Sequence, residues 1–243
     1  MFTTIKKYIP RQFKNLLRKK IYHYRNYCPV CQNWVRSFEP FGIVNRPDAI
    51  CPICGSLERQ RGVWYFFEHK TNLFDRSPKS MLHIAPEKEF SRRLRRVSVL
   101  AYLSADLNDP EAMVKMDITD IPYPNNTFDV IYCSHVLEHV PDDRKAIREL
   151  FRVLKSDGWA LLVVPITSEK TLEDPSVTDS MERLRLFGQE DHIRRYGPDF
   201  INRLEEAGFS IRSYTEAEIV GEENINMYGV TESPLFFCTK ESG

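Results

Sequence analysis

Short apolar runs alternate with helical patterns from residue 80 onward, and this alternation constrains the fold more than any other feature. Helical patterns follow the runs, for example over residues 142–154. Strands that alternate with helices form a parallel sheet covered on both faces. The sequence therefore predicts an α/β domain over residues 71–243. The apolar runs lie at residues 81–85, 97–104, 128–133 and 159–165.

Aspartates stand near the ends of the expected strands. Asp106 lies just past the second strand, and Asp117, followed by Ile118, falls in the next strand-end region. Ligands of parallel sheets bind beyond the carboxyl ends of the strands. There, one carboxylate can take both hydroxyls of a ribose, and another can accept an adenine amino group while the isoleucine packs on the ring. Asp129 opens the fourth strand and is also consistent with a structural cap or turn.

The charge of the 243-residue chain is zero overall but unevenly distributed. Residues 1–70 hold 13 Lys and Arg against 4 Asp and Glu, a net of +9, whereas residues 71–243 hold 21 and 30, a net of −9. Two differently charged modules are therefore expected. No apolar run approaches the roughly 20 residues of a membrane-spanning helix. The N-terminus lacks the apolar stretch of a secretory signal peptide, so a cytoplasmic location is expected.

Two cysteine pairs predict a zinc site in the first module. Cys28 and Cys31, then Cys51 and Cys54, form two C-x2-C knuckles separated by nineteen residues. A two-residue gap lets both sulfurs of a knuckle reach one tetrahedral ion, and four thiolates leave no open position for chemistry. Disulfides are the alternative, but a chain without a signal peptide is expected in a reducing compartment. The two remaining cysteines lie in apolar runs and are expected to be core thiols.

The first 25 residues carry eight basic side chains and no acidic one. Pro10 suits the first turn of a helix, and apolar residues follow it at near-helical spacing. Such a helix can bind an anionic membrane surface or a partner, or it can pack on the protein's own body. The apolar positions are Phe13, Leu16, Leu17, Ile21 and Tyr24.

The second knuckle leads into a predicted connecting helix. Ser56 is a candidate N-cap, and the apolar positions through residue 68 suit a helix. Arg59 and Arg61 could bind an anionic substrate or form ion pairs at a domain junction. The expected organisation is a basic helix over residues 1–25, a zinc-ribbon-like module over residues 26–70 and a domain over residues 71–243.

Residues 80–215 resemble class I S-adenosylmethionine-dependent methyltransferases, of the branch that includes quinone methyltransferases. The similar stretches are MLHIAPEKEF, YLSADLND, VKMDITDIPYPNNTFDVIYCSHVLEHV, ELFRVLKSDGWALLVVP and YGPDFINRLEEAGF. The resemblance implies a Rossmann-like, seven-stranded sheet with helices on both faces, preceded by the small zinc-binding module. It also implies a final antiparallel hairpin near residues 208–214 and 234–239. S-adenosylmethionine would be the methyl donor, with Asp106 at its ribose and Asp117 and Ile118 at its adenine.

The turn after the first strand departs from the family. A glycine-rich turn is usual there, whereas this chain has Ala85-Pro86-Glu87-Lys88-Glu89. Without glycine, backbone angles with positive φ are costly. We expect an altered turn in which Glu87 meets the ammonium group of the cofactor; the alternative is impaired binding. The cofactor-binding candidates are His83, Ala85, Pro86, Glu87, Asp106, Asp117, Ile118, Cys133 and Ser134.

His135, Glu138 and His139 match the pattern H-x-x-E-H, the inverted signature of zinc proteases. On a helix, the two histidines would share one face and could share a metal. The motif follows a buried strand, at the position where the methyltransferase family commonly carries a similar stretch, and this context disfavours the protease. His139 is then expected in the core or beside the site, and His135 is expected to point toward the transferring methyl.

Methyl transfer is an in-line displacement that needs an aligned acceptor, exclusion of water and, for a hydroxyl, a proton acceptor. His135 is one candidate base. The polar segment 189–197 resembles a lid or acceptor-binding loop, with His192 as a second candidate base. The alternative is a linker with surface ion pairs. The substrate-binding candidates in this segment are Arg194, Arg195 and Tyr196.

Three functions fit these features. The leading hypothesis is methylation of a small polar acceptor, with O-methylation of a sugar or glycan as one form, in the cytoplasm or at the inner membrane surface. The second is an RNA base methyltransferase, which the zinc module and the basic cluster at residues 92–96 favour and the acidic second module disfavours. The third is a non-catalytic binding scaffold, which the glycine-free turn favours.

Overall fold

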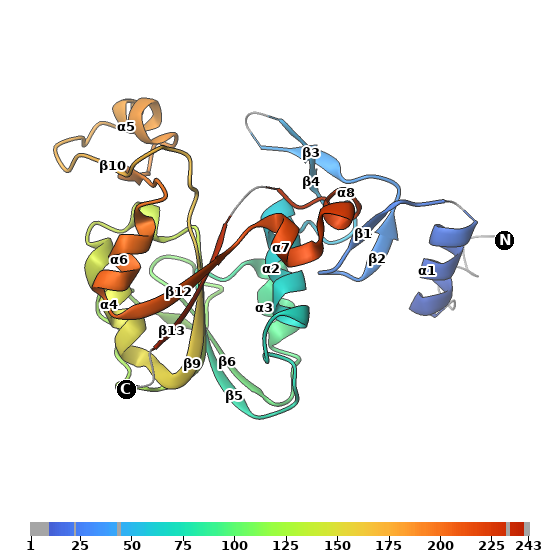
Figure 1. Cartoon of the computed structure of the whole chain (residues 1–243), viewed down its shortest axis with the longest axis horizontal. Helices are drawn as coiled ribbons and strands as arrows, with labels where there is room; N and C mark the ends of the chain where they lie inside the picture. The colour runs from blue at the N-terminus through green and yellow to red at the C-terminus, as the bar shows by residue number, and fades with distance from the viewer. Residues whose placement is uncertain (1–9, 22, 43–44, 232–233, 241–243) are drawn as a thin grey trace. The chain divides into compact units, whose positions relative to one another are not determined.

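The computed structural model describes residues 10–21, 23–42, 45–231 and 234–240 (Figure 1). The chain forms two compact units, a small one from residues 1–72 and 216–232 and a large one from residues 73–215 and 233–243. The expected boundary at 70/71 lies near the observed one at 72/73. However, residues 216–232 join the small unit, which no sequence pattern indicated. Residues 1–9 of the expected basic helix lie outside the described residues.

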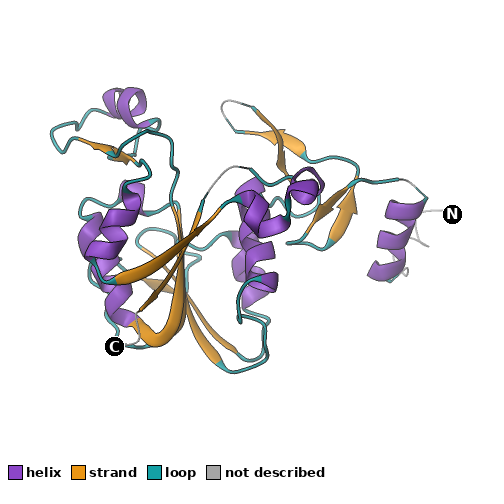
Figure 2. Ribbon diagram, in the orientation of Figure 1, coloured by secondary structure: helices purple, strands orange, loops and turns teal. Residues whose placement is uncertain are grey.

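The small unit combines short helices with two antiparallel hairpins (Figure 2). Cys28 ends the first hairpin's leading strand, and Cys51 directly follows the second hairpin, so each hairpin supports one knuckle. The elements are α1 (Arg11–Lys20), β1 (Asn26–Cys28), β2 (Asn33–Val35), β3 (Glu39–Phe41), β4 (Arg46–Ile50), α2 (Glu58–His69), α7 (Glu216–Val220), η3 (Glu222–Asn224) and α8 (Ile225–Tyr228).

Both predicted helices of the small unit form, with different caps from those expected. Pro10 is the N-cap of α1 and accepts a hydrogen bond from the Lys14 N–H. Leu57 occupies the N-cap position of α2, and its N–H donates to the side chain of Gln60. The prediction of Ser56 as N-cap is wrong, because its hydroxyl instead lies 3.3 and 3.2 Å from the sulfurs of Cys28 and Cys54.

The large unit contains a seven-stranded sheet in the order β12-β13-β9-β8-β5-β6-β7. Strands β5 to β9 pair in parallel, and β13 runs antiparallel to both β9 and β12. The predicted α/β class, seven strands and final antiparallel hairpin are therefore confirmed. The elements are β5 (Lys79–Ile84), α3 (Lys88–Leu94), β6 (Leu100–Asp106), β7 (Val114–Lys115), β8 (Phe128–Ser134), η2 (Leu137–His139), α4 (Asp143–Val153), β9 (Leu154–Val163), β10 (Leu172–Glu173), α5 (Ser180–Phe187), β11 (Arg194–Arg195), α6 (Phe200–Glu206), β12 (Phe209–Tyr214) and β13 (Leu235–Lys240).

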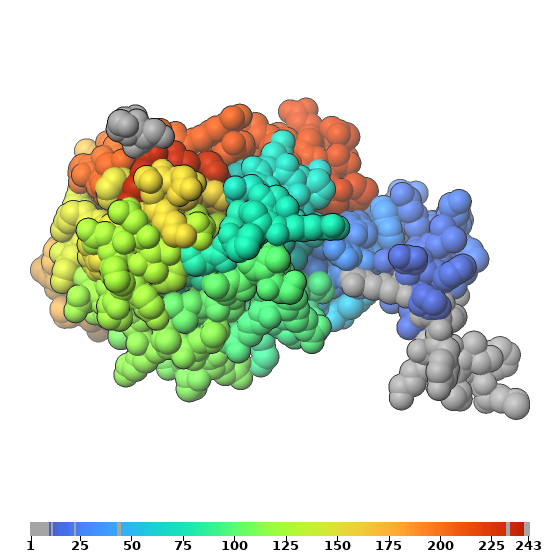
Figure 3. All heavy atoms as spheres, turned by 90° about the horizontal axis from the view of Figure 1, so that it is seen from below, coloured from blue at the N-terminus to red at the C-terminus, as the bar shows by residue number. Residues whose placement is uncertain are grey.

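The core of the large unit lies between the sheet and the helices packed on it. Helix α4 buries Ala146, Ile147, Leu150 and Val153 completely, at helical spacing, and begins where the Asp142 side chain accepts the Lys145 N–H. Burying each Leu, Ile or Val contributes about 1.5–3 kcal/mol. In the space-filling view, the C-terminal segment lies against atoms of β9 (Figure 3), as their antiparallel pairing requires. This packing fixes the central strands and hence the edge where they end.

Two strand ends at that edge adopt left-handed backbone conformations without glycine. Ala85 after β5 has a φ of 48°, and His135 after β8 has a φ of 55°. Their N–H groups donate to the carbonyls of Ala105 and Val163 on neighbouring strands, which holds both turns. The H-x-x-E-H motif does not form an α-helix, because His135 leaves the α region and only the 3-10 turn η2 follows. Non-glycine residues with positive φ are uncommon and often mark functional turns.

Asp129 has the structural role that was left open as an alternative. Its side chain accepts hydrogen bonds from the N–H and hydroxyl of Ser80 and from the ammonium of Lys155. These contacts tie the start of β8 to β5 and β9. Among the described residues, no helix is long and apolar enough to cross a membrane.

Candidate functional site

A cavity of about 660 Å³ lies at the carboxyl ends of β5, β6 and β8. Strands β5, β6 and β8 are parallel and in register at Ile84, Ala105 and Cys133, so the turns that follow them meet at one edge of the sheet. The cavity has the size usual for a small-molecule or cofactor site. The predicted site residues that line it are Ala85, Asp106, Asp117, Ile118 and His135.

The two strand-end aspartates are oriented by their own loops. Oδ1 of Asp106 accepts the N–H groups of Asn108 and Asp109, both at 2.7 Å. Oδ1 of Asp117 accepts the N–H and hydroxyl of Thr119, both at 2.8 Å. In each case the structure gives Oδ2 no hydrogen bond within the described residues. Each carboxylate therefore has one oxygen fixed and one available to a ligand in the cavity.

The side chains of His83 and Glu87 form a buried cluster behind the turn and do not line the cavity. Glu87 accepts hydrogen bonds from His83 Nε2 at 2.8 Å and from the Tyr132 hydroxyl at 2.9 Å, and His83 Nδ1 pairs with the Tyr102 hydroxyl. Burial opposes ionisation of Glu87, but these hydrogen bonds outweigh it and lower the pKa of Glu87. The cluster instead links the turn at Glu87 to β5, β6 and β8. Pro86, Cys133 and Ser134 are also absent from the cavity lining.

His135, Glu138, His139 and His192 form a second cluster at the cavity wall. His135 and His139 line the cavity. The carboxylate of Glu138 is buried, and its Oε1 lies 3.3 Å from His135 Nδ1. His192 is buried with its ring edge-to-face against His139, and the centroids are 4.7 Å apart. Burial, reinforced by the charge of His139, lowers the pKa of His192.

Hydrogen bonds hold the segment that carries His192 against η2. The Ile193 N–H donates to the Glu138 carbonyl at 3.1 Å. The Arg194 guanidinium donates to the carbonyls of Leu137, Val140 and Pro141. The two histidine-bearing segments, far apart in sequence, are thereby brought into contact.

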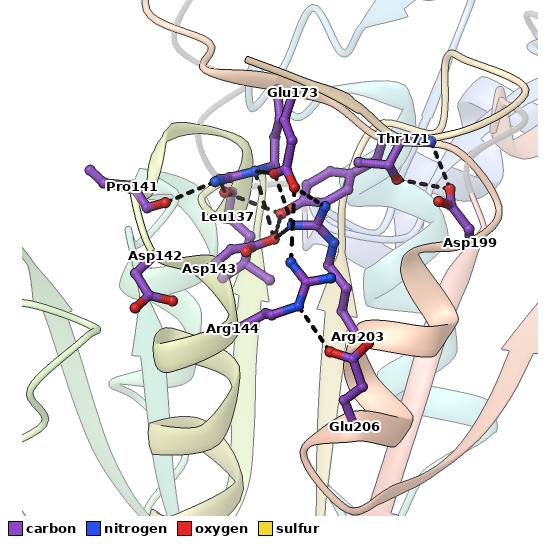
Figure 4. Close-up of polar contacts among 12 residues, drawn as sticks. Leu137, Pro141, Asp142, Asp143, Arg144, Thr171, Glu173, Asp199, Arg203 and Glu206 are labelled. Atoms are coloured by element: carbon purple, nitrogen blue, oxygen red, sulfur yellow. Dashed lines mark hydrogen bonds and ion pairs between the residues drawn. The ribbon is translucent and has the colours of Figure 1, made fainter. Parts of the chain in front are cut away.

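An ion-pair network links Asp143, Glu173 and Arg203 (Figure 4). Arg194 Nε donates to Glu173 at 3.0 Å, while Arg203 donates to both Glu173 and Asp143, in the latter case at 2.6 Å. The Tyr196 hydroxyl donates to Asp143 at 2.6 Å. Both Arg194 and Tyr196 are buried, so their polar groups are engaged by the protein itself.

The expected acceptor-binding residues therefore lie outside the large cavity. Arg194 borders a separate cavity of about 320 Å³ together with Glu173, and Arg195 donates to the hydroxyl of Thr167. Gly197, the residue after Tyr196, packs closely against Lys170. A Cβ atom at this position would lie 2.5 Å from Cα of Lys170, so only glycine fits there. Sequence reasoning missed the network partners Asp143, Glu173 and Arg203, whose positions looked like ordinary helix-end and loop charges.

The four cysteines of the small unit converge on one point. Their sulfur atoms lie within 4.8 Å of one another, with Cys28 and Cys54 at 3.7 Å and Cys31 and Cys51 at 3.9 Å. All four are free of disulfides. Hydrogen bonding among the sulfurs raises the pKa of Cys28 and lowers that of Cys54. The donor set and spacing fit a tetrahedral ion such as Zn²⁺.

Arg61 lies fully buried beside the cysteines. Its guanidinium stacks on the ring of Phe38, 3.7 Å from the centroid. Neither expected role, substrate binding or ion pairing at a domain junction, describes these contacts. Its hydrogen bonds go to backbone carbonyls, those of Asp48, Ala49, Ser56, Tyr228 and Gly229.

Comparison with known proteins identifies the large unit. The methyltransferase domain family matches residues 79–162, the stretch from β5 through most of β9. Residues 79–162 thus match a methyltransferase domain, and the seven-stranded sheet matches the Rossmann-like methyltransferase fold. The match includes the turn at Ala85, Asp106, Asp117 and the H-x-x-E-H motif, so this part of the cavity belongs to the methyltransferase domain.

Curated relatives and solved structures agree with this identification. The uncharacterized methyltransferase YcgJ of Bacillus subtilis is 38% identical over 30% of this chain and 28% of its own length. The ubiquinone/menaquinone biosynthesis C-methyltransferase UbiE of Pasteurella multocida is 27% identical over 63% of this chain and 53% of its own length. This chain thus spans less than two thirds of either relative. A SAM-dependent methyltransferase from Archaeoglobus fulgidus shares the fold of the chain, with a TM-score of 0.50, 15% identity and coverage of 72% of this chain and 91% of that one.

Proposed function

We propose that the protein transfers a methyl group from S-adenosylmethionine to a small polar acceptor. The cavity at the ends of β5, β6 and β8 carries the proposal, because it unites the two half-satisfied aspartates with His135. The family match and the methyltransferase relatives support the same activity. The non-catalytic scaffold remains the outcome if this cavity binds no cofactor.

The residues of the cavity fit the cofactor. The free Oδ2 of Asp106 is assigned to the ribose hydroxyls, and that of Asp117 to the adenine amino group, with Ile118 against the ring. The left-handed conformation of Ala85 gives the turn the backbone course that glycine usually supplies. Glu87, engaged with His83 and Tyr132, is not assigned to the ammonium group.

Titration calorimetry with S-adenosylhomocysteine tests this assignment. We expect the wild-type chain to bind it, and Asp106→Asn to weaken binding at least about 10-fold, because a charged hydrogen bond to the ribose is worth roughly 1.5–3 kcal/mol. Asp157→Asn, an exposed site in β9, should leave the affinity unchanged. A wild-type chain without measurable affinity would reject the enzyme in favour of the scaffold.

His135 is assigned as the proton acceptor. When bound, S-adenosylmethionine supplies a methyl group on a sulfonium sulfur. During transfer of that methyl group to an acceptor hydroxyl, the hydroxyl proton would pass to His135. Its Nε2 is buried without a hydrogen-bond partner, and Glu138 stands beside its Nδ1 and can stabilise the protonated ring.

Two histidine variants test each candidate base in turn. His135→Ala should lower turnover by about 10²–10⁴ with little change in affinity for S-adenosylhomocysteine. His192→Ala should also lower turnover more than cofactor affinity, because His192 lies behind His139 and not on the cavity lining. Unchanged turnover in either variant would remove that histidine from the chemistry.

The acceptor is proposed to carry a hydroxyl group, with sugars and glycans as the first class to test. A histidine beside a carboxylate suits removal of a hydroxyl proton. Production of S-adenosylhomocysteine should be measured with sugar, quinol and RNA acceptors. Turnover restricted to quinols would move the assignment to carbon methylation, and salt-dependent RNA binding would favour the RNA methyltransferase.

The small unit is proposed to hold a structural zinc ion on Cys28, Cys31, Cys51 and Cys54. The convergence of the four sulfurs supports this assignment. Purified protein should contain zinc that Cys51→Ser loses together with the fold of the small unit. If the chain isolated from a reducing cytosolic extract held no metal and had its four cysteines in disulfides, the assignment would be contradicted.

Helix α1 is proposed to contact anionic membrane. Phe13, Leu16 and Ile21 are 60%, 49% and 61% exposed, whereas Asn15 and Arg18 hydrogen-bond to the hairpin of β1 and β2. An exposed apolar row on a basic helix suits a lipid surface. Co-sedimentation with phosphatidylserine vesicles should fall several-fold in Phe13→Ser/Leu16→Ser. Equal binding to neutral vesicles would indicate that the basic charges do not contribute.

A further inference from the structure

Glu138 is a buried carboxylate that the protein leaves without a hydrogen bond among the described residues. Its side chain is 1% exposed, and neither Oε1 nor Oε2 has a hydrogen-bond partner. The approach of His135 Nδ1 to 3.3 Å lacks hydrogen-bond geometry. An unpartnered buried carboxylate is strongly unfavourable, so such groups are usually paired or bound to a metal.

Two imidazole groups face the same point as this carboxylate. Glu138, His139 and His192 each offer one ligand atom, and these atoms lie within 4.8 Å of one another. Two histidines and a carboxylate are a recurring ligand set for Zn²⁺ and for other divalent first-row transition metals. Only small side-chain movements are needed to bring such atoms to one ion.

The outer contacts of both histidines match those of metal ligands. His192 Nδ1 lies 3.2 Å from the carbonyl of Phe187, and His139 Nδ1 lies 3.2 Å from Oδ2 of Asp191. A ligating histidine almost always donates its other ring N–H to a carbonyl or carboxylate. Donation through Nδ1 leaves Nε2 of each ring with a free lone pair.

We propose that Glu138, His139 and His192 bind a divalent transition-metal ion of the Zn²⁺ type, at a site separate from the four cysteines. His139 also lines the large cavity, so an ion held there adjoins the space assigned to the methyl acceptor. Three protein ligands leave a coordination position open. This part of the inference rests on the proposed function. The open position would bind the hydroxyl or carboxylate oxygen of the methyl acceptor, and the ion would favour loss of a hydroxyl proton.

Zinc stoichiometry of the full-length chain tests the site. After saturation with Zn²⁺ and removal of excess by gel filtration, the wild-type chain should retain two ions, one for each donor group. Glu138→Gln and His192→Ala should retain one, and the exposed Glu205→Gln should retain two. One ion in the wild-type chain, or two in Glu138→Gln, would overturn the proposal.

Cobalt substitution gives a readout that needs no variant to fold. The four-cysteine site should give thiolate-to-cobalt charge-transfer absorption, and the proposed site should add visible cobalt bands without it. If every bound Co²⁺ contributes thiolate absorption, the site does not exist. Failure of the proposed function is distinguishable, because it would show as a wild-type chain that binds the second metal but no S-adenosylhomocysteine.

Discussion

The two units satisfy buried arginines in opposite ways. Arg61 in the small unit is fully buried and donates only to neutral backbone carbonyls, five in all. Arg194 and Arg203 in the large unit are almost as buried, but both are paired with Glu173 and lie close to Asp143. A guanidinium can thus be buried either by hydrogen bonding alone or by hydrogen bonding with neutralisation.

The two units differ in which groups supply the negative charge near the buried arginines. Burial lowers the pKa of Arg61, whereas for Arg203 the carboxylates outweigh burial and raise the pKa. The charges that favour protonated Arg61 come from Cys28, Glu58, Cys51 and Cys54. Four thiolates around a divalent ion carry a net charge of −2, so the proposed zinc cluster would supply the anion that the carbonyl cage lacks.

The largest effect is expected from Arg61→Met. The substitution removes the shared donor of five backbone carbonyls and the cation beside the cysteines, at a cost of about 4 kcal/mol or more. Hydrogen exchange should become faster throughout the small unit, and bound zinc should be released faster to a chelator. The exposed Arg36→Met is the matched control. Unchanged hydrogen-exchange rates would mean that water can replace the guanidinium as the donor without loss of stability.

Arg203→Met should destabilise the large unit by about 3 kcal/mol, because Asp143 and Glu173 lose one of the two arginines that they share. Unlike Arg61, this residue has a partner whose charge can also be removed. Adding Asp143→Asn should therefore restore at least about 1 kcal/mol in urea unfolding followed at Trp159. A double variant no more stable than Arg203→Met would show that packing, and not charge, explains the loss.

Acid should weaken the large unit through Glu173. Burial opposes its ionisation, but hydrogen bonds from Arg203 and Arg194 outweigh burial and lower the pKa of Glu173. Its pairing therefore stabilises the fold above the unfolded-state pKa of about 4.3 and is lost as pH falls through the lower folded-state value. The effect should be smaller than those of the arginine variants, because the Glu173 side chain is 35% exposed.

The measurement is the urea midpoint between neutral pH and pH 3, in the wild-type chain and in Glu173→Gln. Other carboxylates with lowered pKa, such as Asp129 and Glu149, contribute equally to both chains, so the difference isolates Glu173. The variant should be less stable at neutral pH and lose less stability on acidification. Parallel curves would assign the acid response to other groups.

The smallest effect is expected where neither unit's charge matters. Ala85→Gly removes the cost of a left-handed alanine but increases the entropy of the unfolded chain, for a net gain of about 0.5 kcal/mol. Thermal unfolding should show a slightly higher Tm, and affinity for S-adenosylhomocysteine should change less than about threefold. A loss above about 1 kcal/mol would show that the methyl group packs well enough to outweigh the backbone strain.

Features with a local signature were predictable from the sequence. The strands β5, β6, β8 and β9 follow from the apolar runs, and the cysteine knuckles follow from their spacing. Asp106 and Asp117 could be placed at the cavity because parallel strands end at one edge. The role of Asp129 as a structural anchor was already one of two readings.

Features that depend on backbone groups or distant partners had no such signature. The hydrogen-bond acceptors around Arg61 are backbone carbonyls. Every residue has such a carbonyl, so no pattern of side chains predicts this arrangement. The left-handed turn at His135 depends on tertiary hydrogen bonds to β9 and not on local propensity. His192 reaches His139 only because Arg194 and Ile193 bind η2, a contact between segments with no shared motif.

The return of residues 216–232 to the small unit has a consequence for the order of synthesis. Two of the five carbonyls around Arg61, those of Tyr228 and Gly229, are made after nearly all of the large unit. During synthesis, the cysteine knuckles therefore emerge early, but Arg61 can form its last two hydrogen bonds only after Tyr228 and Gly229 have been made. The small unit is therefore started first but completed only after most of the large unit, and a nascent chain halted before residue 228 would carry an unfinished small unit and a sheet that still lacks β13.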